Sequence, residues 1–230
     1  IEPYQWSTII KCLYQKVHFF YIIFLMKKYP DKIPVFPLSG VIYFPKTNLP
    51  LNIFEERYLK LVNDAYNNDK LMGMVQSKKG NDSVYDVGCL GKISDYQKSK
   101  DGRILINLTG LTRFNIVKEI SNNKLYREFQ VDYNNFMNEV ENDQCEIDAS
   151  GLMEKAKPFF KKNGLLLNWK EFEKLDQTQK INTLSMIAPI TNEEKQKLLE
   201  AISLESKVKT LESIFSFYLY ETSLNNHTIQ

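Results

Sequence analysis

Residues that could carry out catalysis are sparse in this 230-residue chain. The segment GCLGK at 88–92 invites comparison with a phosphate-binding loop. However, it lacks the four-residue spacing between the glycines, and Ile93 stands where a serine or threonine would follow the lysine. The adjacent carboxylates at 55–56 and 193–194 fall in the first turns of expected helices, where the helix dipole stabilises negative charge. The sequence has no Gly-x-Ser-x-Gly nucleophile turn. We therefore predict that the chain is not an enzyme.

Metal-ligating and redox-active residues are equally scattered. Cys12, Cys89 and Cys145 are far apart and have no C-x-x-C spacing, which argues against both a disulfide framework and a zinc site. His18 and His227 lie near opposite ends of the chain. We expect no metal and no cofactor, and we interpret the cysteines as free thiols in a reducing cytoplasm.

Side chains that could bind a ligand are easier to find. Arg113 stands in GLTRFNI at 110–116, between a glycine and an aromatic residue. It either holds a turn or a carboxylate within the fold or faces a ligand. Tyr96 and Tyr126 would offer aromatic surface with a polar tip on strands or turns. These three residues are the predicted peptide contacts.

The charge balance limits the class of partner. The chain has 30 Lys and Arg residues against 28 Asp and Glu residues, which gives a net charge of +2. It has no basic stripe with interleaved aromatic residues, so we do not expect it to bind nucleic acid. A hydrophobic content of 43% supports a substantial core, and we expect partners to be recognised through shape and apolar contact.

Residues 33–133 follow mostly a strand pattern. Segments rich in β-branched and aromatic residues occur at 87–93, 103–110, 111–120 and 125–133. Asp101-Gly102 predicts a hairpin turn, and residues 121–124 predict another. Gly88 and Gly91 lie inside a strand pattern and would allow a bulge or a close backbone approach. Short, closely spaced strands predict a small closed or half-closed β-barrel.

One helix interrupts the strands early in the chain. Four apolar residues at helical spacing form a single stripe: Tyr58, Leu61, Val62 and Ala65. Phe54, just before this helix, is predicted to anchor it to the barrel.

After residue 142 the pattern becomes helical, following an acidic, Asn-rich linker at 134–148. Thr191 and Glu194 form a capping box, so we predict that the last helix begins there and runs to about Tyr220. Its apolar stripe comprises Leu204, Val208, Leu211, Phe215 and Tyr218.

The first 25 residues are predicted to be a leader or upstream read-through, because Met26 is a natural start. Their apolar run is shorter than the ~20 residues of a membrane-spanning helix, and two lysines follow it. A membrane anchor is the alternative, whereas a chain that starts at Met26 is not expected to contact a membrane. The expected divisions are 26–135 for the β domain, 147–222 for the helical subdomain and 223–230 for a tail.

Several clusters recur in the order of a known family. They are IPVFPLSGVIYFPKTNLPLNIFEERY at 33–58, GMV at 73–75, VGCLGKI at 87–93, DGRILINLTGLTRFNIV at 101–117 and LYREFQVDY at 125–133. In this order the chain resembles the N-terminal, substrate-binding domain of the ATP-dependent protease Lon. It departs from the family pattern at Lys46, Asn52 and Glu56, where the family often has Gly, His and Pro.

The resemblance implies an α+β fold, in which a PUA-like β-pseudobarrel with an early helix precedes a C-terminal helical bundle. It also implies a stand-alone, non-catalytic module of bacterial cytoplasm, without the ATPase and serine–lysine protease modules of full Lon. Such a module would recognise unfolded or tagged polypeptides, as an adaptor in proteolysis or quality control, with a protease as a further partner. An RNA-binding PUA-like module and a small-molecule-binding barrel are the alternatives.

Overall fold

The computed structural model describes residues 29–80, 82–136 and 147–227, with side chains described up to residue 220. The predicted leader and most of the predicted linker lie outside these residues. The strands are β1 (Lys32–Leu38), β2 (Asn48–Ile53), β3 (Leu71–Gln76), β4 (Val87–Lys98), β5 (Ile104–Ile120) and β6 (Arg127–Asp132). The helices are α2 (Glu56–Asn67), the 3-10 helix η1 (Asn134–Phe136), α4 (Ser150–Lys162), α5 (Trp169–Phe172), α6 (Gln177–Ile187), α7 (Asn192–Glu200) and α8 (Leu204–His227).

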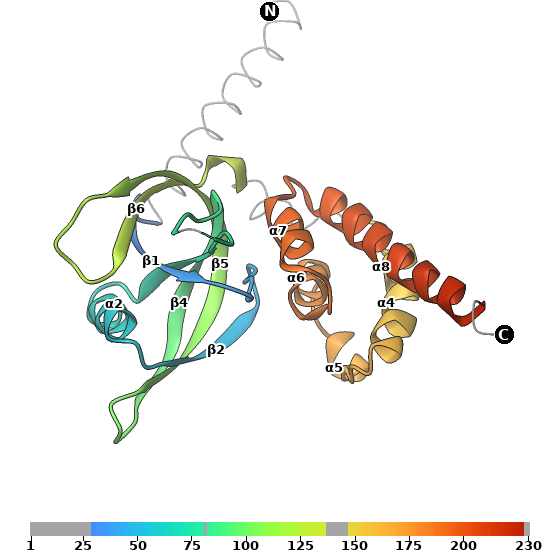
Figure 1. Ribbon diagram of the computed structural model, residues 1–230, viewed down its shortest axis with the longest axis horizontal. Coiled ribbons are helices and arrows are strands. Elements are labelled where there is room, and N and C mark those ends of the chain that lie inside the picture. Colours follow the sequence, from blue (N-terminus) through green and yellow to red (C-terminus); the bar gives the residue numbers. More distant parts are fainter. Residues whose placement is uncertain (1–28, 81, 137–146, 228–230) are drawn as a thin grey trace, which may run out of the picture. The chain divides into compact units, whose positions relative to one another are not determined.

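The six strands form one sheet that closes on itself (Figure 1). Their order is β2-β5-β4-β3-β1-β6, and a further pairing of β5 with β6 completes a ring. The β1–β3 pair is parallel, whereas β5 runs antiparallel to β2, β4 and β6. Closure is possible because β5, at 17 residues, is long enough to pair with β2 along its first half and with β6 along its second. The predicted α+β fold, a β-pseudobarrel with an early helix followed by a helical bundle, is confirmed.

β5 is one continuous strand where the sequence suggested two that meet near Gly110. A Cβ at Gly110 would lie 2.3 Å from the carbonyl oxygen of Phe44. The Gly110 N–H donates to the Thr47 carbonyl at 2.9 Å, and the Lys46 N–H donates to the Gly110 carbonyl at 2.9 Å. The glycine therefore lets the β1–β2 connection cross closely over the strand, rather than ending the strand.

The two glycines of β4 allow the predicted close approach, by another backbone at Gly88 and by a side chain at Gly91. A Cβ at Gly88 would lie 2.5 Å from the carbonyl oxygen of Met74, and one at Gly91 would lie 2.6 Å from Cγ of Leu108. The β4–β5 register also shifts between Leu90 and Gly91. Both predicted roles, close approach and bulge, thus occur in one strand.

The helix α2 packs its predicted stripe against the barrel. Tyr58, Leu61, Val62 and Ala65 are all buried and belong to the barrel core. The prediction that Phe54 anchors this helix was wrong, because its side chain is 66% exposed. Side chains alternate along an extended chain, and Ile53 is the residue that faces inward here.

The capping box at the start of α7 is confirmed. The Thr191 N–H donates to Oε2 of Glu194 at 2.8 Å, and the Glu194 N–H donates to Oγ1 of Thr191 at 3.2 Å. The single helix predicted from there to Tyr220 is instead divided into α7 and α8. Oγ of Ser203 accepts the Ser206 N–H at 3.1 Å, as an N-cap residue would, so α8 has its own start.

The helical part has its own core, which extends onto the barrel. Val208, Leu211 and Phe215 of the predicted α8 stripe are buried, and Leu204 and Tyr218 pack against the same cluster. The Phe159 and Phe215 rings stack at 4.2 Å, while Phe44 and Val87 of the barrel region join this core. Over the residues described, no helix combines the length and apolar character needed to cross a membrane.

Candidate functional site

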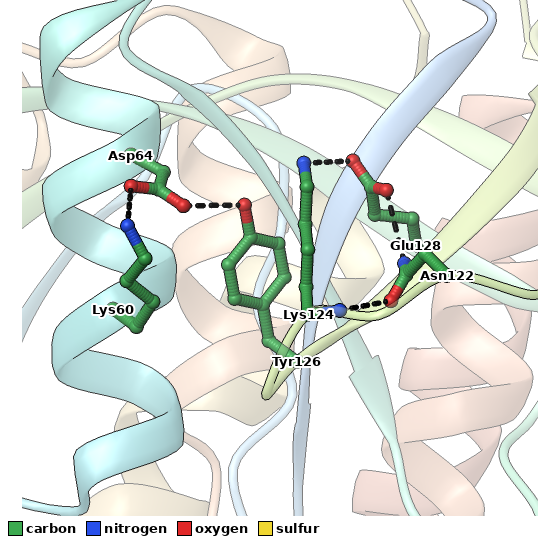
Figure 2. Close-up of polar contacts among 6 residues, drawn as sticks. All are labelled: Lys60, Asp64, Asn122, Lys124, Tyr126 and Glu128. Atoms are coloured by element: carbon green, nitrogen blue, oxygen red, sulfur yellow. Dashed lines mark hydrogen bonds and ion pairs between the residues drawn. The ribbon is translucent and has the colours of Figure 1, made fainter.

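The hydroxyl of Tyr126 fastens the end of the β5–β6 connection to α2 (Figure 2). It donates to Oδ2 of Asp64 at 2.9 Å, while Nζ of Lys60, one turn earlier in α2, donates to Oδ1 of Asp64 at 2.7 Å. The Tyr126 side chain is buried. One carboxylate therefore links a helix to a loop that follows it by some sixty residues in the sequence.

A second group of contacts shapes the same connection (Figure 2). Nζ of Lys124 donates to Oε1 of Glu128 at 2.8 Å, and Nδ2 of Asn122 donates to Oε2 of Glu128 at 2.9 Å. The Lys124 N–H also donates to Oδ1 of Asn122 at 2.9 Å. The predicted turn at 121–124 is thus held by its own Asn122 and Lys124 side chains and by Glu128 of β6.

The pKa shifts follow these contacts. The hydrogen bond from Lys60 lowers the pKa of Asp64, and the Tyr126 hydroxyl adds to this effect. Burial raises the pKa of Tyr126. The hydrogen bond to Glu128 raises the pKa of Lys124 to about 12. The loop is therefore held most firmly while Asp64 is ionised and Tyr126 is neutral.

We expect acid to weaken the Asp64 contact. Because its pKa is lower in the folded chain than the ~3.9 of an unfolded one, its contribution is present above about pH 4 and is lost as pH falls through the folded pKa. Asp64→Asn should lower the free energy of unfolding at pH 7 by less than about 1 kcal/mol, since its side chain is 33% exposed. The variant should also lose less stability on acidification, as measured by urea unfolding across pH.

Asp95→Asn is the matched control for charge. Asp95 is exposed on β4, and its substitution also replaces one carboxylate by an amide. Parallel pH profiles for the parent and Asp64→Asn would contradict the assignment.

A groove of about 820 Å³ lies beside this loop. Five segments line it: the end of β1, the start of α2, residues 77–80 with Asp82 after β3, Glu119 near the end of β5, and residues 125–127 at the start of β6. We call this surface the barrel groove. A second depression of about 490 Å³ adjoins it, and Tyr126 and Arg127 line both. Of the three predicted contacts, Tyr126 is the one that lies in this groove.

The charges of the barrel groove are largely paired. Arg57 contacts Glu55 at 2.9 Å, and Arg127 contacts Glu119 at 2.6 Å. Arg127 also donates to the carbonyl of Asp82 at 2.9 Å, and its hydrogen bond lowers the pKa of Glu119. Pairing leaves little net field in the groove, which suits a partner without strong charge. Within the described part of the chain, no cluster of His, Cys, Asp and Glu could hold a metal ion.

Apolar side chains stand at the groove without a covering element. Leu125 is 59% exposed and lines both depressions, and Phe54 directly precedes Glu55 of the groove wall. Half-buried Pro37 and Leu38 supply apolar surface from β1. Leu125 was not among the predicted contacts, although an apolar residue directly after a polar turn was a usable signal.

Arg113 lies elsewhere, in the interior. Its side chain is 0% exposed, and Nη1 donates to the carbonyls of Leu199 and, at 2.6 Å, of Ala201. Its guanidinium lies over the Phe136 ring, 4.1 Å from the centroid. The geometry favours the first of the two interpretations, an arginine that holds a turn, because a buried guanidinium does not reach a peptide at the surface. The turn it holds is the α7–α8 connection.

Tyr96, on β4, also contacts α2. Its hydroxyl donates to Oδ1 of Asn63 at 2.7 Å, and its ring stacks on Tyr66 at 4.3 Å. Tyr96 and Tyr126 thus bind successive residues of α2, and successive helical residues point about 100° apart. The two tyrosines therefore contact different sides of the helix. Tyr96 does not line the barrel groove.

The sheet offers one further candidate for peptide contact. β2 is the end strand of the sheet order and pairs through one side with β5. Pro50, in the middle of β2, has no backbone N–H to donate. We therefore expect its nitrogen to face away from the hydrogen bonds between β2 and β5. An added strand would therefore find fewer donors on this edge, which leaves the barrel groove as the stronger candidate.

A protein-family model matches most of the barrel and the helical part. The model of the ATP-dependent protease La (LON) substrate-binding domain matches residues 32–215. The chain belongs to this family. The matched Lon substrate-binding domain covers both the barrel and most of the helical part.

Curated Lon proteases are similar over most of this chain. Lon protease of Buchnera aphidicola is 24% identical over 196 residues, and Lon protease of Bacillus thuringiensis is 26% identical over 204 residues. Each alignment covers 79% of this chain and 24% of the relative. The chain therefore spans about a quarter of the length of these curated relatives.

Two solved structures share the fold. A Lon N-terminal domain protein from Xanthomonas campestris superposes with a TM-score of 0.56 at 21% identity, covering 80% of this chain and 97% of that one. The N-terminal domain of Lon protease from the Mycobacterium avium complex has a TM-score of 0.58 at 15% identity, with 80% and 98% covered.

One departure of this Lon substrate-binding domain has a visible backbone cost. Lys46, one of the three positions where the sequence was expected to depart from the family pattern, adopts φ of +58°, in the left-handed region that glycine occupies without a Cβ penalty. Nζ of Lys46 lies 3.4 Å from Oδ2 of Asp176 in the helical part. The side chain that strains this turn therefore also links it to the start of α6.

Proposed function

We propose that this chain binds protein substrates, and that the barrel groove is where an extended, unfolded segment lies. The exposed Leu125 at the junction of two depressions carries the proposal, because a large apolar side chain left in water marks a binding surface when it adjoins a groove. Membership of the Lon substrate-binding family supports the class of ligand.

The groove suits a sequence-tolerant ligand. Leu125, Pro37 and Leu38 would contact apolar side chains of the segment, while polar atoms of Tyr126 and of the ion pairs would bind its main chain. An unfolded segment loses conformational freedom when it binds, so affinity for any single segment would be weak. Weak, tolerant binding is what a module that samples misfolded chains requires.

We further propose that the bound polypeptides are unfolded or tagged proteins destined for proteolysis, with a protease as the second partner and the cytoplasm as the compartment. The protease names of the relatives support the partner. The three widely spaced cysteines support a reducing compartment.

Leu125→Ser should weaken binding of a reduced, carboxymethylated and therefore permanently unfolded protein by about fivefold, as one well-placed interface side chain does. Fluorescence anisotropy of the labelled unfolded protein measures this. Val117→Ser is the matched control, because Val117 is 58% exposed on β5 and does not line the groove.

Structured RNA in the same assay tests the alternative module. Tight RNA binding with a steep salt dependence, together with equal affinities of the parent and Leu125→Ser for the unfolded protein, would overturn the proposal.

A further inference from the structure

A second exposed apolar surface lies in the helical part, in the connection between α4 and α5. Leu166 is fully exposed, at 102%, and Leu165 is 38% exposed. They line a pocket of about 510 Å³ together with Leu167, Trp169 and two lysines. We call this the helical pocket. It shares no residue with the barrel groove.

Local backbone chemistry explains why these leucines stand outside the core. Gly164 has φ of +68° and ends α4 in the left-handed conformation. The Leu165 N–H donates to the Phe160 carbonyl and the Gly164 N–H donates to the Lys161 carbonyl, which together form a Schellman motif. The motif turns the chain out of the helix just before Leu166. The exposure is thus built into a well-bonded turn.

The far wall of the pocket is anchored. Leu167 and Trp169 pack against the helical core, and the Trp169 ring meets the Phe160 and Phe172 rings edge-on at 6.0 and 5.5 Å. An apolar side chain that entered the pocket would therefore meet a fixed surface. A preformed pocket loses little free energy to ordering on binding.

The charge of the pocket has one sign. Lys157 and Lys161 line it, and no carboxylate among the described residues does. Lys157 is held 3.3 Å from Glu173 and lies over the Trp169 ring. Lys161 is exposed in the last turn of α4, and among the described residues it has no ion-pair partner. The helix dipole favours a lysine in the last turn of a helix. The ammonium group of Lys161 nevertheless remains available to pair with a carboxylate of a ligand.

We propose that the helical pocket is a second contact for protein substrates, and that it takes a segment in which a large apolar residue neighbours aspartate or glutamate. The apolar side chain would lie against Leu166 and Trp169, and the carboxylate would face Lys161. The inference rests on the proposed function and names the substrate class of a different surface. Two weak contacts on one polypeptide would raise its overall affinity, because the second contact forms at high effective concentration.

A labelled peptide that alternates leucine with aspartate is the probe, and the same peptide with lysine in place of aspartate is its counterpart. Leu166→Ser should weaken binding of the acidic peptide about fivefold. Lys161→Glu should weaken binding of the acidic peptide and strengthen binding of the lysine peptide, because it puts a negative charge in place of the ammonium group that the acidic segment would face. Affinity of the parent for the acidic peptide should fall with salt.

Two matched variants serve as controls. Ile202→Ser replaces an apolar residue that is 77% exposed in the α7–α8 connection. Lys100→Glu makes the same charge change at the exposed tip of the β4–β5 hairpin. All four substituted side chains are at the surface, so the variants should fold, which circular dichroism verifies.

Equal effects of Leu166→Ser and Ile202→Ser, or of Lys161→Glu and Lys100→Glu, would overturn the inference. So would self-association or binding to anionic lipid vesicles that Leu166→Ser abolishes while peptide binding is unchanged. The two proposals fail separately. If Leu125→Ser weakens binding of the unfolded protein and Leu166→Ser does not, only the proposal for the helical pocket is contradicted. If Leu166→Ser weakens it and Leu125→Ser does not, only the proposal for the barrel groove is contradicted.

Discussion

Arg113→Met is expected to lower the free energy of unfolding by roughly 3 kcal/mol or more. The guanidinium is fully buried and donates to the carbonyls of Leu199 and Ala201. Hydrogen bonds from a charged donor are each worth about 1.5–3 kcal/mol, and the substitution leaves carbonyls that the guanidinium had satisfied. Methionine is unbranched and fills similar space, but it removes both the donors and the cation that lies over the Phe136 ring, so the effect would report the loss of the guanidinium as a whole. Urea unfolding measures it.

The place of the damage is a second readout for Arg113→Met. The two carbonyls belong to the connection between α7 and α8, so amide hydrogen exchange should accelerate at the end of α7 and the start of α8 before it does in the barrel. Arg103→Met is the control, because Arg103 is exposed and pairs with Asp101 of its own turn. It should leave stability near that of the parent. If Arg113→Met lowered the free energy of unfolding as little as the control does, Arg113 would not be what holds the α7–α8 connection.

Gly88→Ala is expected to destabilise the barrel by roughly 3 kcal/mol. The new Cβ would lie 2.5 Å from the Met74 carbonyl oxygen, 2.5 Å from Cζ of Phe114 and 2.6 Å from Cγ1 of Val75. One of these atoms is backbone and all three lie in the sheet, so relief requires β3 and β4 to move apart. A thermal or urea unfolding curve measures the loss.

Gly151→Ala is the same substitution where the neighbour can yield. Its Cβ would lie 2.8 Å from Oε1 of Glu212, the end of a flexible side chain, and alanine is the better helix former. Its effect should stay within about 1 kcal/mol. If both variants were equally stable, β3 and β4 would be able to separate at little cost, contrary to a close-packed barrel.

Local patterns were readable wherever the cause lay within a few residues. The stripe on α2 and the capping box of α7 depend on spacings of three and four residues, and both are present. Gly88 was recognisable because a glycine inside a strand pattern signals close approach. Gly110 was misread as a break in the strand, because what crosses it is a segment more than sixty residues earlier.

The candidate site was only partly readable for the same reason. Tyr126 was chosen as an aromatic residue with a polar tip, and it does line the barrel groove. Its partner Asp64 lies in a different element, and no sequence spacing links the two. Leu125 and Leu166 look like ordinary core residues, because leucine is usually buried. Only the absence of a covering element in the described structure distinguishes them.

The sequence by itself determined the family, the presence of a barrel and a bundle, and features such as the stripe of α2 and the start of α7, since these follow from periodicity, capping chemistry and ordered motifs. The tertiary structure alone decided what Arg113 holds and which leucines stay in water. Burial depends on which distant segment packs over a residue, and that is a property of the closed sheet and the helices together. Both proposed binding surfaces arise at that level.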